Sequence, residues 1–261
     1  MNWSQHAFEH VGITRDDAGV LVVTLHTDGG SCVWGADPHR EIADALGLVA
    51  QDRDARVVIV TGAGQEFLTL PTGGPEWIAR GNLSARSWDR VMREGNRLIH
   101  NLLDVEVPMI AAVNGPAVVH SELALLCDIV LASDTAVFAD AAHFPGGLVP
   151  GDGMQVLWPL LLGPNRGRHF LLTGQQLDAY EAKALGVVGE VLPQAQLLER
   201  AHALAAGLAR NNPALLRSTR AVLTRPLKRA MADDLPLGLA LEAFTSLSGA
   251  EWFSDEGPDR R

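Results

Sequence analysis

The stretch VPMIAAVNGPAVVHSELALLCDIVLASDTAVFADAAHFPGGLVPGDG, residues 107–153, decides the fold of this 261-residue chain. Its short apolar runs predict buried strands, and the Asn114-Gly115-Pro116 sequence after the first of them predicts a turn. The predicted elements are strands at 109–113, 129–132 and 136–139 and a short buried helix at 122–127. Strands that alternate with helices indicate an α/β fold.

The chain on either side of this stretch divides into two parts. The N-terminal part predicts strands at 19–27 and 56–61 and helices at 37–49 and 84–103, with Asp37 as N-cap of the first helix. Beyond Gly153 the chain predicts helices at 154–162, 166–173, 178–185, 196–210, 213–224 and 227–247. We therefore expect a core with the active site over residues 1–195, and a helical cap or oligomerisation region over 196–261 whose tail from Glu251 is loose.

Composition excludes several classes of function. The 21 Lys and Arg residues face 31 Asp and Glu residues, so the net charge of −10 argues against binding to nucleic acid or to an anionic membrane. The two cysteines, Cys32 and Cys127, form no CxxC pair and predict neither a zinc knuckle nor a disulfide framework. Without a signal peptide or an apolar run of about 18 residues, the chain is expected to be soluble and cytoplasmic.

Motifs for cofactors and metals are also missing from the sequence. Gly62-Ala63-Gly64 does not extend to a dinucleotide-binding fingerprint, and the nine histidines form no HxxxH or HExxH pair on a predicted helix. Ser31, Ser121 and Ser133 lack the GxSxG frame of an α/β-hydrolase nucleophile. We expect neither a cofactor nor a metal.

The chain resembles the crotonase superfamily, which has the enoyl-CoA hydratase/isomerase fold. The resemblance covers residues 15–225 and rests on PxIAAVNG (108–115), ELALxCD (122–128), GxxPGxG (147–153) and the flanking segments 56–64 and 171–193. It implies a spiral of ββα units in two sheets, followed by C-terminal helices through which three chains assemble into a trimer or a dimer of trimers.

Three segments depart from the hydratase pattern of that superfamily. Residues 118–120 read Val-Val-His where hydratases have a glycine-rich segment, and residues 67–73 read FLTLPTG where they have small residues. His143 stands where hydratases carry a catalytic Glu, whereas Glu122 keeps the other Glu position and is expected to be structural. These departures imply that the apparatus which binds a CoA thioester is altered.

The same departures resemble one branch of the superfamily, 6-oxocamphor hydrolase and related β-diketone hydrolases. This resemblance rests on VWGADPH (33–39), NGPAVVHSE (114–122), HFPGGLVPGDG (143–153), NRGRHFLLTGQQLDA (165–179) and LPLGLALEA (235–243). It implies that water cleaves a C–C bond of an alicyclic or bicyclic 1,3-diketone and yields a keto acid. The residues that fall on the branch's active-site positions are Trp34, His39, His120, His143, Asp152 and Glu242.

Roles for these six residues follow from what the reaction needs: a base for water, donors to two developing oxyanions, and a proton source. His143 is the candidate base, and we expect Asp152 to accept from its other ring nitrogen and fix its tautomer. His120 and Trp34 are the candidate donors that bind and protonate the enolate. His39 and Glu242 are expected to pair and support the pocket.

Two alternatives remain open at this point. A CoA-thioester enzyme, either a hydratase, an isomerase or a thioester hydrolase, would need two N–H groups near Leu70 and Val119 aimed at one oxygen, and a basic pocket for nucleotide phosphates. A non-catalytic partner subunit with the same fold would not bring the six residues to one cavity.

Overall fold

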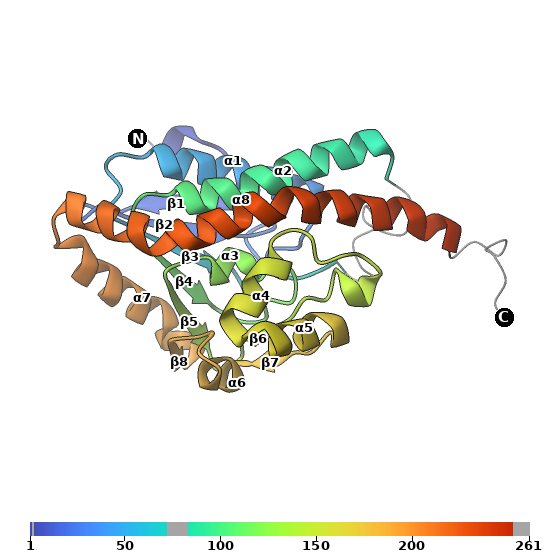
Figure 1. Cartoon of the computed structure of the whole chain (residues 1–261). Helices are drawn as coiled ribbons and strands as arrows, with labels where there is room; N and C mark the ends of the chain where they lie inside the picture. The colour runs from blue at the N-terminus through green and yellow to red at the C-terminus, as the bar shows by residue number, and fades with distance from the viewer. Residues whose placement is uncertain (2, 72–82, 253–261) are drawn as a thin grey trace.

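The computed structural model describes residues 1, 3–71 and 83–252, which form an α/β core crossed on one side by long helices (Figure 1). The strands are β1 (Val11–Arg15), β2 (Val20–Leu25), β3 (Val57–Gly62), β4 (Met109–Val113), β5 (Ile129–Ser133), β6 (Val137–Phe138), β7 (Leu177–Asp178) and β8 (Glu190–Leu192). The α-helices are α1 (Ala36–Gln51), α2 (Ala85–Asp104), α3 (Glu122–Leu125), α4 (Met154–Leu162), α5 (Pro164–Thr173), α6 (Ala179–Ala184), α7 (Gln194–Ala209) and α8 (Pro213–Trp252). Short 3-10 helices cover Trp3–Gln5 and Phe144–Gly146.

The main sheet has the strand order β1-β2-β3-β4-β5-β8. β1 pairs antiparallel with β2, and every other pairing in this sheet is parallel. All residues of β3 and β4 are buried, because helices cover both faces of a parallel sheet. α7 packs on one face through Leu197, Ala201 and Ala205, and α1 and α2 belong to the core on the other.

A second, smaller layer of strand pairing makes the spiral. Segments that follow β2, β3 and β4 form parallel bridges, Val33 with Thr69 and Leu68 with Ala117, and Ala117 in turn pairs with Phe138 of β6. β6 then pairs antiparallel with β7. Each turn of the chain thus contributes a strand to the main sheet, a segment to the second layer and then a helix, which confirms the expected spiral of ββα units.

Most predicted elements form within a few residues of their expected bounds, and β4 and α4 match them. The prediction that Asp37 is the N-cap of α1 is wrong, because Gly35 occupies that position. Asp37 lies in the first turn, where its negative charge interacts favourably with the helix dipole. The predicted helices 213–224 and 227–247 form one continuous helix, α8, which contains Pro226 and Pro236. β1, β7 and β8 were not predicted.

The C-terminal helices pack closely on the rest of the chain. α7 lies on β3, β4 and β5, and α8 runs along α2 and reaches α4. The predicted boundary between the core and the C-terminal region, at residues 195 and 196, falls inside α7. The division into these two regions stays a prediction, and so does the assembly of three chains into a trimer. Of the tail predicted to be loose, Glu251 and Trp252 belong to α8, and residues 253–261 lie outside the described residues. Among the described helices, none combines the length and apolarity that a membrane span requires.

Arg220 of α8 caps the C-terminal end of α2. Its guanidinium donates to the backbone oxygens of Leu102, Leu103 and Val105, and its Nε donates to Asp128 Oδ2 at 2.8 Å. The last carbonyl groups of a helix have no partner within the helix, so this one side chain satisfies several of them and adds a charge that opposes the helix dipole. Because Arg220 is only 2 % exposed, its charge depends on these partners.

Replacing Arg220 should therefore destabilise the fold strongly. We expect Arg220→Ala to lower the free energy of unfolding by about 3–5 kcal/mol, because it leaves Asp128 and the end of α2 without their cation. Urea unfolding at pH 7 measures this difference. Arg225→Ala, which removes an exposed arginine from the same helix, is the control and should change stability by less than about 0.5 kcal/mol. Equal effects of the two substitutions would contradict the capping role.

Candidate active site

A small buried cavity lies where the second layer of strands meets α1, α2 and α8. Its free volume is about 20 Å³, which is room for about one water molecule. Five of the six predicted site residues line it, and the sixth, Trp34, packs against two of them. The lining residues are His39, Val91, Gly95, Leu98, Ile99, His120, Glu122, Ala142, His143, Asp152, Leu239 and Glu242.

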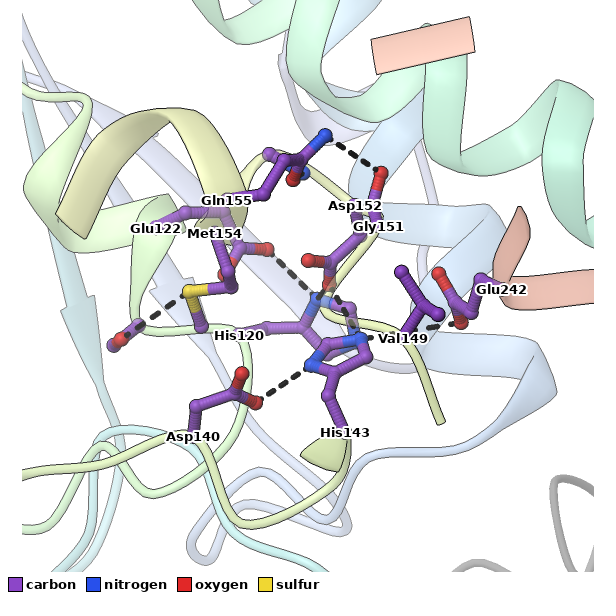
Figure 2. Close-up of polar contacts among 12 residues, drawn as sticks. His120, Glu122, Asp140, His143, Val149, Gly151, Asp152, Met154, Gln155 and Glu242 are labelled. Carbon is purple, nitrogen blue, oxygen red and sulfur yellow. Dashed lines mark hydrogen bonds and ion pairs between the residues drawn. The ribbon is translucent and has the colours of Figure 1, made fainter. Parts of the chain in front are cut away.

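His143 is held between carboxylates on both of its ring nitrogens (Figure 2). Its Nδ1 lies 2.6 Å from Asp140 Oδ1, and its Nε2 lies 3.4 Å from Asp152 Oδ2. Glu242 Oε1, on α8, lies 3.9 Å from the same Nε2. The predicted proximity of His143 and Asp152 is therefore found, but Asp140 occupies the outer nitrogen where Asp152 was expected.

Asp152 lies between two imidazole rings. Its Oδ2 is 3.0 Å from His120 Nδ1 as well as 3.4 Å from His143 Nε2. These contacts are ion pairs, and within the described part of the chain neither oxygen of Asp152 has a partner at hydrogen-bond geometry. Asp152 therefore joins the two histidines through the charge of its carboxylate.

The loop that carries Asp152 is fixed against α8 by direct backbone contact. A Cβ atom on Gly151 would lie 2.1 Å from Gly238 O, and one on Gly238 would lie 2.3 Å from Gly151 O, so only glycine fits at either position. Gln155 Nε2 donates to Gly151 O and Gln155 Oε1 accepts from Gly153 N, as the upper part of Figure 2 shows for the first of these bonds. These contacts hold Asp152 on one side of the cavity and Glu242 on the other.

His120 adopts the left-handed backbone conformation, with φ of 47°. This conformation is uncommon for residues other than glycine. Its Nδ1 lies 2.7 Å from Glu122 Oε1, and its ring packs on Trp34 with a centroid separation of 3.8 Å. Trp34 Nε1 is buried without a hydrogen-bond partner among the described residues. Glu122 contacts His120 and also lines the cavity, and its structural role stays a prediction.

The charges of this buried cluster balance one another. Burial works to lower the pKa of His120, but Glu122 and Asp152 outweigh it and raise that pKa to about 10. Burial opposes the charge of His143 in the same way, but Asp140 and Asp152 raise its pKa well above 6.5. Burial also works to raise the pKa of Asp152, yet His143 and His120 hold it below its usual range. Both imidazoles therefore carry protons at neutral pH.

The two glutamates respond differently. Burial raises the pKa of Glu122 to about 7 and that of Glu242 to about 8, because the neutral acid is favoured away from water. Glu242 therefore contributes a largely uncharged carboxyl group to the cavity at pH 7.

His39 does not pair with Glu242, contrary to the prediction. Its Nδ1 lies 3.2 Å from Glu94 Oε2 on α2 instead, whereas Glu242 lies 3.9 Å from His143 Nε2. Burial lowers the pKa of His39, which the contact with Glu94 only partly offsets. His39 packs edge-on against Trp34, with centroids 5.4 Å apart, so it still belongs to the predicted group.

His120, Glu122 and Asp152 also form a donor set that a divalent cation could use. One ligand atom from each lies within 4.8 Å of the others. The proton on His120 already offsets the two carboxylates, and a metal would have to displace it.

Sequence reasoning missed Asp140 and Glu94, which hold His143 and His39, and Leu239, which contributes to the apolar wall. Asp140 precedes His143 by three residues, and the Asp-x-x-His spacing just before a proline-containing turn was the available signal. Nothing in the sequence linked α2 to His39, because that contact joins residues 55 positions apart.

Comparison with known proteins places the chain in a family. Residues 15–248 match the enoyl-CoA hydratase/isomerase family. A short-chain enoyl-CoA hydratase from Clostridium acetobutylicum is 28% identical over 245 residues, which are 94% of this chain and 90% of the relative. The solved structure of an enoyl-CoA hydratase/isomerase from Mycobacterium paratuberculosis has a TM-score of 0.84 at 27% identity, over 93% of this chain and 96% of that one.

A second solved structure is more similar in sequence. The β-diketone hydrolase of the cyanobacterium Anabaena, bound to (S)-3-oxocyclohexyl acetic acid, has a TM-score of 0.87 at 45% identity, over 92% of this chain and 95% of that one. The family match, the similarity to these relatives over about nine-tenths of the chain and the spiral of ββα units lead to the same assignment. The chain belongs to the enoyl-CoA hydratase/isomerase family, the crotonase superfamily.

Proposed function

We propose that this enzyme hydrolyses a C–C bond of an alicyclic or bicyclic β-diketone and releases a keto acid. The observation that carries the proposal is the buried imidazole of His143, whose Nε2 lies 3.4 Å from Asp152 Oδ2 at a cavity with an apolar opposite wall. The 45% identity to a β-diketone hydrolase supports it.

The lining of the cavity suits an uncharged carbocycle, although side chains must move to enlarge its free volume of about 20 Å³ before such a molecule can enter. Val91, Leu98, Ile99 and Leu239 supply aliphatic surface, and Gly95 leaves the wall flat where α2 approaches His39. Among the described residues that line the cavity, none is Lys or Arg. A substrate that carries nucleotide phosphates would find no cation here except the imidazoles.

Cleavage of the diketone proceeds by proton transfers that His143 and His120 can perform. His143 Nε2 takes a proton from water as the water oxygen bonds to one carbonyl carbon, which gives a tetrahedral oxyanion. Collapse of the oxyanion breaks the C–C bond, and its electron pair becomes an enolate delocalised onto the second carbonyl oxygen. The protonated His120 and the unpaired Trp34 N–H donate hydrogen bonds to that oxygen. Proton return to carbon completes the keto acid.

The ligand of the Anabaena enzyme is the kind of product that this reaction makes. Addition of water across one C–C bond of bicyclo[2.2.2]octane-2,6-dione, with cleavage of that bond, gives 3-oxocyclohexyl acetic acid. The carbon between the two carbonyls of this dione is a bridgehead, so the dione cannot enolise there and remains electrophilic. We propose substrates of this type for the present chain.

The alternatives have less support. The peptide groups of Leu70 and Val119, which a CoA-thioester enzyme would use, do not belong to the residues that line the cavity. A non-catalytic subunit would not be expected to bring His39, His120, His143, Asp152 and Glu242 to one cavity, and all five line it.

Assays with both substrate classes test the proposal. We expect the protein to convert bicyclo[2.2.2]octane-2,6-dione into 3-oxocyclohexyl acetic acid, which gas chromatography measures. We expect it not to hydrate crotonyl-CoA. His143→Gln should reduce kcat/KM for the dione by ~10²–10⁴-fold, because general-base help is lost. His202→Gln removes an exposed histidine of α7 and should leave the rate unchanged. Hydration of crotonyl-CoA without any diketone cleavage would refute the proposal.

The pH dependence of kcat/KM should follow the two histidines. His143 acts as a base only after it loses its proton, so the rate should rise with pH through a pKa well above 6.5. His120 must keep its proton to donate, so the rate should fall again near pH 10. Steady-state rates between pH 6 and pH 11, with circular dichroism to confirm the fold at each end, measure both limbs. An acid limb at or below 6.5 would contradict the assignment of His143.

A further inference from the structure

We infer that Asp140 is the positioning residue that orients His143 and selects its tautomer, whereas Asp152 acts on the cavity side and joins His143 to His120. This inference rests on the proposed function. It assigns two tasks of a single His–Asp dyad to different residues: Asp140 orients His143, and Asp152 contacts the nitrogen that faces the cavity.

Distances separate the two carboxylates. Asp140 Oδ1 lies 2.6 Å from His143 Nδ1, a short charge-assisted hydrogen bond, whereas Asp152 Oδ2 lies 3.4 Å from Nε2. Asp152 is closer to His120, at 3.0 Å. His143 thus has its strongest contact with Asp140, and Asp152 has its strongest contact with another histidine.

Asp140 depends on His143 for compensation of its charge. Both residues are only 2 % exposed. Among the described residues, the ion pair of Asp140 is with His143, and its Oδ2 has no hydrogen-bond partner. Burial of a carboxylate costs several kcal/mol unless a cation or donors offset it. A buried aspartate with one hydrogen-bonded partner is therefore a strong local constraint on that partner.

The consequence concerns which nitrogen of His143 can act as the base. When Nδ1–H is donated to Asp140, the lone pair of the neutral ring is on Nε2, which faces Asp152, Glu242 and the cavity. A ring with the opposite tautomer would present an N–H to the cavity and could not take a proton from water. Asp140 thus keeps the productive tautomer, as the carboxylate of a Ser-His-Asp triad does for its histidine.

Four groups face His143 and set the pH at which it loses its proton. They are Asp140 beside β6, Asp152 before α4, Glu242 on α8 and the ring of His120, whose centroid is 6.2 Å away. Asp140 and Asp152 favour the protonated ring most, Glu242 adds to this effect once it is ionised, and Asp140 is the nearest of the three. Removal of its charge should therefore move the acid limb of kcat/KM to lower pH.

Asp140→Asn in the full-length enzyme tests this. The amide keeps the size of the side chain but loses the charge and can donate to Nδ1, which favours the wrong tautomer. With bicyclo[2.2.2]octane-2,6-dione we expect kcat to fall by at least ~100-fold with little change in KM, and the acid limb to move to lower pH. Asp134→Asn replaces an exposed aspartate of the neighbouring turn and is the matched control, with unchanged rate and limb. If Asp140→Asn behaves like this control, the inference is wrong.

Nitrogen NMR of the native protein gives a second test that needs neither activity nor a stable variant at position 140. In protein labelled with ¹⁵N-histidine, His143→Gln identifies the His143 signals by their absence. We expect Nδ1 to stay protonated at the pH where Nε2 loses its proton. A neutral ring protonated on Nε2 would overturn the inference even if the diketone is hydrolysed. Failure of the native enzyme to hydrolyse any diketone, with the Nδ1–H tautomer present, would instead overturn the proposed function alone.

Discussion

The Oδ2 atom of Asp152 lies within 3.4 Å of two imidazole nitrogens, and the chemistry of the site depends on this contact. A carboxylate this far from water is stable only beside positive charge. His120 and His143 provide that charge, and in return they hold protons that free imidazoles would lose near neutral pH. In the proposed mechanism, the same interaction would make His120 a persistent donor and His143 a base that is stronger than free imidazole but works only at higher pH.

Most of the ionisable residues of the site lie in loops and not in helices or strands. His120, Asp140 and His143 come from segments that leave the second layer of strands, and Asp152 comes just before α4. Because those strands are parallel, the segments that leave them lie side by side at one edge. α8 then crosses that edge and adds Glu242 and Leu239 (Figure 1). Arg220 holds the other end of the contact between α8 and α2, so the cap on α2 and the wall of the cavity belong to one packed pair of helices.

The sequence predicted the architecture and the six residues, but not how they pair. Periodicity and turn residues located β4 and α4 with their bounds, and similarity to known families brought together residues as distant as Trp34 and Glu242. β7 and β8 were missed because strands of two or three residues are too short to show an alternating pattern. Two helices were predicted, at 213–224 and 227–247, but they form one helix, in which the packed surface along α2 tolerates Pro226. The partners of His143 and His39 depend on side-chain directions across elements, which no linear pattern encodes.

The crossing of Gly151 and Gly238 has a practical meaning for anyone who wants to change the substrate range by directed evolution. At these positions any larger residue would push apart the loop and helix that carry Asp152 and Glu242, so variation there would disable rather than retune the enzyme. Val91, Leu98 and Ile99 line the cavity on α2 without such backbone contact. Libraries confined to that helix face would change the size and shape of the cavity while the ionisable groups keep their places.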